Sequence, residues 1–590
     1  MKKQRFGIWL IQLCLLVLIG IIWMLYLQHT QAFNYFYREQ QQIFLNDFDY
    51  VVSLLKPMGG LVLIVSQWLV QFFVEPYMGA LITTLLCLFI AVFLILLVDI
   101  YKQQHWWLMP LAFLPPMLYG LCLEEVYIHY EGLVAMAFGA FCLWLYTCLP
   151  KGNAIIRTVG GIILALALFY AAGPVAIIIS ISMLLLDLMR KEVVGKPYGI
   201  LPLITVLLAG LWAYYQQWRV DAASIYWMNG YAEYYFEPTA LHTLTWISIP
   251  LWVLLCWIAG KLGNFATWMK VSLTCCLLAL VTIVCLSIHK AQAHPAYEAL
   301  LQQTHYADTE EWDKLTQVSG ISASNDVQMN YLNLALAKQG LLLDNLFAVP
   351  QKDIGSIITR DARYTDVGVL LSRIYYHIGA IGAAQNQAFS SVVGITYGNP
   401  SMTKLLIKTY LINGYYALAE KLIARLEKTW YYADWASNQR RFLYNDVAVE
   451  ADPELGTKRR YLANDNRYTM LYGPVDDLVT ILTDHPENRE AAEYLLSMFL
   501  ISKDVNSIQA FINQFAGKGS MEEAPIRLQE AIVLLHEHDT NYCLEHGVSR
   551  ETLQAFEAFR QTYMTLRNQG RDVRALTPQY GKTFWYYMIR

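Results

Sequence analysis

The sequence predicts an all-α protein in which a polytopic transmembrane helix bundle precedes a soluble α-helical repeat domain. Two observations predict this division. Apolar residues make up 56% of the 590 residues, and charged residues make up only 15%, below the usual share of about 25%. The charges concentrate after residue 290, whereas the chain before it consists of apolar stretches and short loops. We expect a transmembrane domain over 1–290 and an extracytoplasmic helical domain over 291–590.

Charge and cysteine content narrow the classes of protein to which the chain can belong. The formal net charge of -4 lacks the basic footprint of a nucleic-acid-binding protein, so we expect no nucleic-acid partner. Nine of the ten cysteines lie in or beside apolar stretches, and Cys543 lies in the polar half. No spacing there indicates a disulfide framework or a zinc site, so we interpret the cysteines as packing residues.

Nine stretches before residue 290 are apolar and long enough to cross the ~30 Å hydrocarbon layer as helices. They are 7–27, 78–100, 106–123, 131–149, 155–171, 174–189, 198–217, 241–260 and 268–288. No small-residue cleavage site follows the first stretch, so we expect a retained signal anchor. Prolines interrupt several stretches, and neighbouring helices can satisfy the carbonyls that such breaks free.

The basic residues of the short loops predict the orientation. With the N-terminus in the cytoplasm, the inside segments carry eleven Lys and Arg residues, and the outside segments carry three, Arg38, Lys56 and Arg219. This is a strong positive-inside bias. Because nine crossings are an odd number, residues 291–590 then lie outside the cytoplasm. We expect a multi-pass protein of a bacterial inner membrane, with a periplasmic C-terminal domain and the lipid bilayer as a partner.

The apolar stretch 58–74 could also just span the membrane. A crossing there would move every later loop to the other side and abolish the charge bias. We therefore interpret this stretch as a partly embedded helix on the outer face, with Trp68, Phe72 and Phe73 at the interface. A tenth crossing is the alternative.

The first outer loop, 29–57, holds Arg38, Glu39, Asp47 and Asp49 among several aromatic residues. Two carboxylates that lie two residues apart, such as those of Asp47 and Asp49, can share a divalent cation or place a base beside a ligand. Asp47, Asp49 and Glu39 are therefore candidate catalytic residues, with Arg38 as a candidate substrate-binding residue. The alternative is a solvated face on a helix that lies along the membrane.

The second outer loop places Glu124, Glu125, His129 and Glu131 within eight residues. These carboxylates repel one another unless a cation lies among them. Glu124, Glu125 and Glu131 are therefore candidate ligands of a divalent cation such as Mg²⁺ or Mn²⁺. The alternative is ordinary solvation of a polar loop.

A later outer loop, 219–239, is rich in aromatic residues beside a few carboxylates. Tyr231 and Tyr234 suit contact with a sugar ring or a lipid headgroup, and Arg219 suits a phosphate. These three are candidate substrate-binding residues. A plain interfacial aromatic belt is the alternative.

The order of these features resembles the GT-C class of polytopic glycosyltransferases over residues 1–290. In that class, acidic residues follow the first span and precede a Pro-containing turn and an interfacial helix. The resemblance implies a lipid-linked sugar donor, with Asp47, Asp49 or Glu39 activating the acceptor or binding metal. The chain departs from the class at Lys56-Pro57-Met58, where His-Pro-Pro is usual, and at Arg38-Glu39, where an Asp-Glu pair is usual. The whole chain also resembles a family of large bacterial envelope proteins with this two-part layout, which implies no activity.

The polar half contains an internal repeat. Tyr375, Gly379 and Ala384 recur 35 residues later as Tyr410, Gly414 and Ala419. This period resembles the ~34 residues of tetratricopeptide repeats, in which two helices meet at a small residue. We expect further helix pairs at 308–318 with 326–339, where Gly340 ends the second helix, and at 488–502 with 504–516.

Two other segments of this half are distinctive. The stretch 428–468 is rich in aromatic and charged residues, which favours an irregular connection, with a concave recognition surface as the alternative. The end of the chain is too apolar for a free tail. We expect 584–587 to pack on the helical repeats or on the membrane face.

The sequence supports two functions. The first is a transferase that takes a polyprenyl-linked sugar, while its helical repeats bind the acceptor or a partner. The second is a non-catalytic, membrane-anchored scaffold for envelope proteins. An anchor requires one span and not nine with acidic loops, so the transferase is favoured at this stage.

Overall fold

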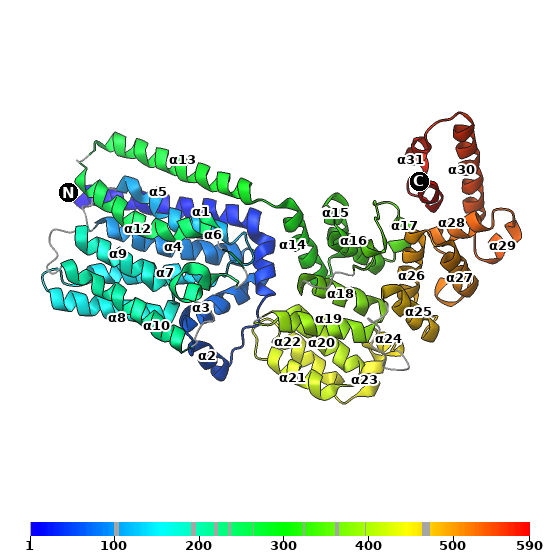
Figure 1. Cartoon of the computed structure of the whole chain (residues 1–590), viewed down its shortest axis with the longest axis horizontal. Helices are drawn as coiled ribbons and strands as arrows, with labels where there is room; N and C mark the ends of the chain where they lie inside the picture. Colours follow the sequence, from blue (N-terminus) through cyan, green and yellow to red (C-terminus); the bar gives the residue numbers. More distant parts are fainter. Residues whose placement is uncertain are drawn as a thin grey trace. The chain divides into compact units, whose positions relative to one another are not determined.

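The computed structural model describes residues 2–99, 106–189, 196–216, 222–233, 236–237, 239–262, 265–322, 325–359, 365–395, 397–462 and 473–590. Within these residues the regular secondary structure is helical and no strand occurs, which confirms the all-α fold class. The chain divides into two compact units (Figure 1). Unit 1 comprises Met1–Glu39 with Phe44–His294, and unit 2 comprises Gln40–Ile43 with Pro295–Arg590.

Among the described residues, unit 1 contains seven helices that are long and apolar enough to cross a membrane. They are α1 (Lys2–Glu39), α4 (Met78–Asp99), α7 (Glu131–Cys148), α8 (Ala154–Ala172), α10 (Leu201–Tyr215), α12 (Ala240–Lys261) and α13 (Thr267–Gln292). Each overlaps one of the nine predicted spans. The other two predicted spans are shorter apolar segments, namely Trp106–Cys122, which contains α5 (Met109–Ala112) and α6 (Leu114–Cys122), and α9 (Val175–Met189).

Helix α1 is longer than the sequence indicates. The predicted first span ends at Leu27, but the helix continues without a break to Glu39. Arg38 and Glu39 therefore lie in the last turn of a long apolar helix and not in a loop, which corrects the expectation for the first outer loop. That loop contains the short helix α2 (Phe48–Leu55).

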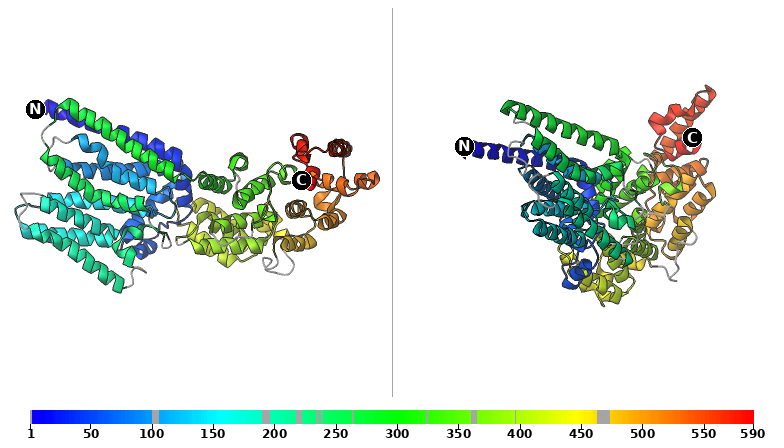
Figure 2. Two further views of the ribbon diagram at one scale, coloured as in Figure 1. Left: turned by 45° about the horizontal axis from the view of Figure 1, so that its top comes forward. Right: turned by 60° about the vertical axis from the view of Figure 1, so that its left-hand side comes forward.

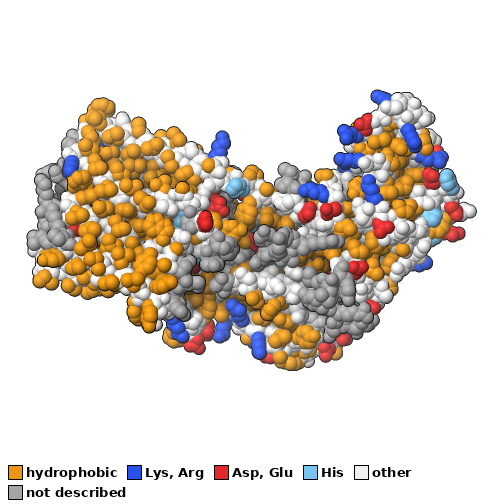
Figure 3. Space-filling view, viewed as in Figure 1, with side chains coloured by type: hydrophobic (Ala, Val, Ile, Leu, Met, Phe, Trp, Pro, Cys, Tyr) orange, Lys and Arg blue, Asp and Glu red, His pale blue; other side chains and the backbone are white. Residues whose placement is uncertain are grey.

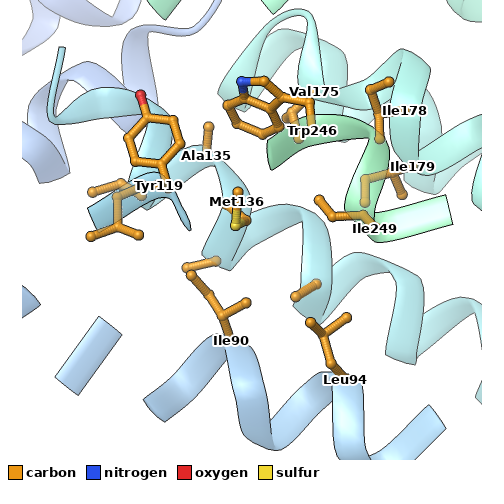
Figure 4. Packing of buried hydrophobic residues seen from close by; sticks show 14 of the residues in the cluster. Ile90, Leu94, Tyr119, Ala135, Met136, Val175, Ile178, Ile179, Trp246 and Ile249 are labelled. Carbon is orange, nitrogen blue, oxygen red and sulfur yellow. The ribbon is translucent and has the colours of Figure 1, made fainter. Parts of the chain in front are cut away.

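The helices of unit 1 pack around one apolar core. Helix α4 lies against α1 and α7, α9 lies against α8 and α12, and α13 packs on α5 and α6 (Figures 1 and 2). Figure 4 shows Ile90 and Leu94 of α4, Met136 of α7 and Ile249 of α12 within this core. The outward faces are apolar as well, and Figure 3 shows hydrophobic side chains over most of the visible face of this unit. A bundle that is apolar inside and outside is typical of a lipid-embedded protein.

The segment 58–74 enters and leaves at one end of this bundle. Gly59, directly before α3 (Gly60–Val70), donates its N–H to the carbonyl of Tyr170 in the last turn of α8 at 2.8 Å. Phe73 lies in the short 3₁₀ turn Gln71–Val74. The centroid of its ring lies 5.1 Å from that of Tyr35 on α1 and 5.2 Å from that of Tyr130. We call this end, where α1 finishes, the Arg38 end. Both ends of the segment 58–74 therefore lie at the Arg38 end of the bundle.

The opposite end of the bundle contains a buried ion pair. Arg157, near the start of α8, donates from Nε and Nη2 to Oδ1 of Asp187 on α9 at 2.8 and 2.6 Å. The hydroxyl of Tyr146 on α7 donates to the other oxygen of Asp187 at 2.5 Å, and its ring lies 4.3 Å from the guanidinium carbon. All three residues are almost fully buried. The pair therefore joins α7, α8 and α9 at one depth.

Unit 2 consists of helices joined in antiparallel pairs by short turns. They include α14 (Pro295–Asp308), α15 (Trp312–Ser322), α16 (Asp326–Lys338), α18 (Thr365–Ile378), α19 (Ile381–Gly394), α20 (Pro400–Ile412), α21 (Tyr416–Leu426), α25 (Pro474–Asp484), α26 (Arg489–Ser502), α27 (Val505–Phe515), α28 (Ile526–Leu535) and α30 (Arg550–Asn568). The pairs expected at 308–339 and 488–516 correspond to α15 with α16 and to α26 with α27, within a few residues at each end.

Gly340, Gly379 and Gly414 follow α16, α18 and α20 in the same way. Their φ angles are +70, +85 and +73°, in the left-handed region. The residue after each glycine returns its N–H to a carbonyl five positions earlier, as Ala380 does to Tyr375 at 2.9 Å. This turn satisfies a helix carbonyl that lacks a partner, and glycine fits because it has no Cβ. The 35-residue recurrence in the sequence thus corresponds to equivalent helix ends.

The other two distinctive segments of this half also contain helices. The stretch expected to be an irregular connection contains the short helices α22 (Ala433–Gln439), α23 (Asp446–Ala451) and α24 (Leu455–Arg460), and its part 463–468 lies outside the described residues. At the chain end, α32 (Phe584–Ile589) packs on α28 of the helical unit, one of the two positions expected for it. The Phe584 N–H donates to the Glu530 carboxylate at 2.7 Å, and the Trp585 indole donates to the Glu530 carbonyl at 2.8 Å.

The buried ion pair generates a stability prediction. Arg157→Met leaves the Asp187 carboxylate buried without its cation, a change that costs on the order of 3–5 kcal/mol. We expect a large fall in the melting temperature of the detergent-solubilised protein, and a partial recovery when Asp187→Leu is added. Lys56→Met, at an exposed cation of the same unit, is the matched control. Equal melting temperatures for wild type and Arg157→Met would show that the pair is dispensable.

Candidate functional site

Arg38 is buried at the end of α1, and its guanidinium binds backbone carbonyls. It donates to the carbonyl oxygens of Ile128 at 2.6 Å, Leu123 at 2.7 Å and Glu125 at 2.9 Å. Its Nε donates to the side-chain oxygen of Asn34, one turn earlier, at 2.8 Å. A guanidinium has donors only, so these acceptors occupy most of its hydrogen-bonding capacity. Arg38 therefore holds the turn after α6 in place, whereas the sequence indicated a substrate-binding role for it.

Two more side chains on the same face of α1 bind that turn. The amide of Gln31 donates to the carbonyl of Gly120 at 2.9 Å, and the amide of Asn34 donates to those of Leu123 and Glu124 at 2.9 and 3.1 Å. Residues three or four positions apart share one helix face, so 31, 34 and 38 form a polar stripe. The carbonyls at the end of α6 lack partners within their own helix. The stripe supplies those partners inside an otherwise apolar bundle.

Glu124 pairs with a histidine from the last turn of α13. Oε1 of Glu124 lies 2.9 Å from Nδ1 of His289 and 3.5 Å from the hydroxyl of Tyr26 on α1. The Tyr26 and His289 rings meet edge to face, with centroids 5.7 Å apart. The three side chains join α1, the turn after α6 and α13. The sequence did not identify His289 or Tyr26, because their relation to Glu124 depends on helix packing and not on spacing.

The turn after α6 also pairs with the loop that contains Tyr231. The N–H of His129 donates to the carbonyl of Tyr231 at 2.9 Å, and the N–H of Glu233 donates to that of Tyr127 at 2.8 Å. Nε2 of His129 lies 3.4 Å from Oε1 of Glu233, and this contact holds the pKa of the Glu233 carboxyl below its ordinary value. The two loops therefore form one connected layer at the Arg38 end.

The structure places the expected substrate-binding residues differently from the sequence interpretation. The hydroxyl of Tyr231 donates to the carbonyl of Ala172 and accepts from the N–H of Val175 at 3.2 Å, and its ring stacks on Trp246. Only 2% of Tyr231 is exposed, and the contacts of its hydroxyl group fix the junction of α8 and α9. Arg219 and Tyr234 lie outside the described residues.

The expected metal ligands do not converge. Among the described residues, no group of three His, Cys, Asp or Glu side chains is placed to hold a metal ion, although Glu124, Glu125 and Glu131 are all described. Glu124 turns toward His289. Glu131 lies in the first turn of α7, where the helix dipole stabilises a carboxylate. Their proximity in sequence therefore reflects two separate local roles.

The three expected catalytic carboxylates lie in different environments. Glu39 is buried in the last turn of α1. Asp47 is the residue before α2, and Asp49 lies exposed in its first turn beside Phe48, which is 80% exposed. Helix α2 has no buried residue. Asp47 and Asp49 thus remain outside the buried framework, whereas Glu39 is within it.

The Arg38 end is consequently a hydrogen-bonded framework with two carboxylate–imidazole contacts, Glu124 with His289 and His129 with Glu233. Such pairs can hold or pass a proton when a substrate reaches them. Both contacts are also cross-links between elements that are distant in sequence. This cross-linking role accounts for the geometry of both contacts without a bound substrate.

The chain belongs to the family described as "Family of unknown function (DUF6057)", which matches residues 7–590. The match covers nearly all of unit 1 and unit 2 of this chain. No curated protein and no solved structure is similar to the chain.

The carbonyl contacts of Arg38 generate a prediction. Arg38→Leu leaves three loop carbonyls without their donor, and each buried polar group that loses its partner costs about 1–3 kcal/mol. We expect faster proteolysis within 120–130 and a lower melting temperature in detergent. Arg38→Lys should recover part of the loss, since an ammonium reaches fewer carbonyls, and Lys56→Leu should change neither value. Normal stability together with a loss of partner or substrate binding would instead indicate that Arg38 binds a ligand.

Proposed function

We propose that the chain is a multi-pass membrane protein of the bacterial envelope whose helical unit binds another envelope protein and holds it at the membrane. The proposal rests mainly on the way unit 2 is attached. Its first segment begins at Gln40, directly after α1 ends at Glu39. Its second segment begins at Pro295, shortly after α13 ends at Gln292. A binding domain with two such short connections is joined to the apolar bundle at two points of the chain.

The first of these connections is an integral part of unit 2. Gln42 pairs with Tyr397 in a parallel bridge, and the N–H of Ile43 donates to the carbonyl of Tyr397 at 2.9 Å. The side chain of Gln40 accepts from the N–H of Ser401 at 3.2 Å and donates to the hydroxyl of Tyr432 at 3.2 Å. Only 2% of Ile43 is exposed. We call residues 40–43 the strap.

The strap determines which crossings are possible. Because the strap and residues 295–590 belong to one unit, they lie on one side of the membrane, and the chain between them crosses an even number of times. The eight predicted spans after α1 satisfy this condition only if α3 does not cross as well. The bias of basic residues favours a position outside the cytoplasm for that side, and in the proposal this is the periplasm.

The surface of unit 2 supports a protein partner. Phe389 and Val393, one turn apart on α19, are 53% and 67% exposed. Trp430 and Val447, in the segment between α21 and α24, are 62% and 77% exposed. Exposed apolar side chains that form a patch are typical of protein contact sites, and Phe389 and Val393 are neighbours on one helix face.

A transferase that uses a polyprenyl-linked sugar is the second candidate. It is favoured by the order of α1, the acidic start of α2 and the apolar α3, which is the order that the GT-C resemblance implies. Asp47 and Asp49 are its candidate catalytic residues. It receives less support, because Arg38, Glu124 and Tyr231 already have partners within the framework.

The crossing pattern is tested by side-specific labelling. In a background without the exposed cysteines, Asn46→Cys and Lys518→Cys should react with an impermeant maleimide added to spheroplasts. Gly152→Cys, between α7 and α8, should react only after the membrane is opened. Labelling of Asn46→Cys and Gly152→Cys from the same side would overturn the assignment of α3.

One experiment separates the two functions. Tagged full-length protein is cross-linked in cells, and the cross-linked proteins and the lipid-linked sugars are quantified for wild type, Asp47→Asn and Asp49→Asn. The scaffold predicts one partner in near-stoichiometric amount, recovered equally from all three. The transferase predicts that the lipid-linked sugar accumulates in the variants. No reproducible partner in the wild type would contradict the scaffold.

A further inference from the structure

Helix α2 has an apolar side that is largely uncovered in the part of the chain that the structure describes. Residues three or four positions apart share one helix face, and on α2 such a face is formed by Phe48, Val51, Val52 and Leu55. Phe48 is 80% exposed and Val52 is 37% exposed, and the helix contains no buried residue. An amphipathic helix whose apolar side is uncovered lacks the partner that such a side requires.

The other two sides of α2 have evident surroundings. On one side, the hydroxyl of Tyr50 donates to the side-chain oxygen of Gln67 on α3 at 2.8 Å, and the Tyr50 ring centroid lies 5.8 Å from that of Phe44. On the next side, Asp49 and Ser53 are both exposed, as polar residues in water are. The apolar side is therefore separate from the side that faces the protein and from the polar side. A helix with these three sides is typical of a membrane interface.

Helix α8 carries an exposed apolar stripe on its outward side. Its members follow one another at intervals of three or four residues, and their exposed fractions range from 37 to 75%: Ile155, Val159, Ile163, Leu166 and Tyr170. Because α8 is long and apolar enough to cross a membrane, this stripe is suited to face lipid. At 1.5 Å per residue it extends for about 22 Å, which is most of the ~30 Å hydrocarbon layer. Tyr170 therefore lies near the edge of that layer.

Tyr170 connects the stripe of α8 to α2. Its hydroxyl donates to the carbonyl of Leu55 at 3.1 Å, and its carbonyl accepts from the N–H of Gly59 at 2.8 Å. Leu55 is the last residue of α2, where a carbonyl has no partner within its own helix. Helix α2 thus meets α8 where the exposed stripe ends, at the Arg38 end of the bundle (Figure 1).

Exposed aromatic rings mark the same level on the neighbouring helix. Helix α10 packs on α8, and its last turn carries Trp212 and Tyr215, which are 53% and 82% exposed. Because α9 returns through the bundle between them, α8 and α10 run in the same direction and end on the same side. Tryptophan and tyrosine are enriched where the hydrocarbon layer meets the headgroups. These rings and Tyr170 place the lipid headgroups at the level of α2.

From this arrangement we propose that α2 lies in the interfacial layer of the bilayer, with Phe48 and Val52 among the lipid chains just below the headgroups. The apolar side of α2 continues the stripe of α8, so the same lipid covers both. A helix of eight residues is about 12 Å long, which is too small for the roughly 1,200 Å² that a stable protein interface buries. The inference rests on the membrane placement of unit 1 in the proposed function, and it adds a contact with the lipid surface outside the spans.

The test places a fluorophore on two sides of α2 in the full-length protein. In a background without the exposed cysteines, Phe48→Cys, Val52→Cys and Ser53→Cys are labelled with nitrobenzoxadiazole and reconstituted into vesicles of phosphatidylethanolamine and phosphatidylglycerol. Ile163→Cys, in the stripe of α8, is the matched control for contact with lipid. A phospholipid with a nitroxide on its acyl chain quenches labels that lie in lipid, whereas iodide quenches labels that lie in water.

The emission of labels at positions 48 and 52 should shift to the blue and be quenched by the nitroxide, as at position 163. Iodide should quench the label at position 53. Replacing phosphatidylglycerol with phosphatidylcholine should leave this pattern unchanged, because the contact is apolar. Quenching of 48 and 52 by iodide, protection of both from either quencher, or loss of the pattern without phosphatidylglycerol would overturn the inference.

The label at position 163 separates this inference from the proposed function. If the nitroxide quenches position 163 but not positions 48 and 52, unit 1 lies in the membrane and only the placement of α2 is wrong. If iodide quenches position 163, the membrane placement in the proposed function fails together with the inference.

Discussion

Backbone carbonyls inside an apolar bundle must find donors, and the Arg38 guanidinium meets this requirement for the turn after α6. Three carbonyls of that turn accept from it, and Asn34 and Gln31 supply donors for others on the same face of α1. The turn then pairs with the loop of Tyr231, whose hydroxyl reaches the junction of α8 and α9. The ordering of the Arg38 end therefore depends on this polar stripe, because the apolar interior of the bundle offers no alternative partners.

The elements that depend on local sequence could be predicted. Long apolar runs gave the helices of unit 1, and Gly340, Gly379 and Gly414 marked helix ends because a left-handed turn favours glycine. The stretch 58–74 was predicted to be helical from its apolar run, and it contains α3 and the 3₁₀ turn that follows. In each case the signal lies within a few tens of residues of the element.

The roles of the polar residues could not be predicted in the same way. Arg38, Glu124 and Tyr231 were singled out as ligand-binding residues, since a charged or aromatic residue at a membrane surface is costly without a function. Their partners are carbonyls and side chains such as His289, from elements far away in the sequence. Single-sequence patterns contain no information about which helices meet.

The strap also has a consequence for the order of events during biosynthesis. Gln40 emerges from the ribosome long before Ser401, which lies 361 residues later in the chain. Contacts over such separations form late, because closing a long loop is entropically costly. Residues 40–43 can therefore take their place in unit 2 only after residues 397–432 have been made. The strap is thus an early-synthesised segment that joins its own folding unit late.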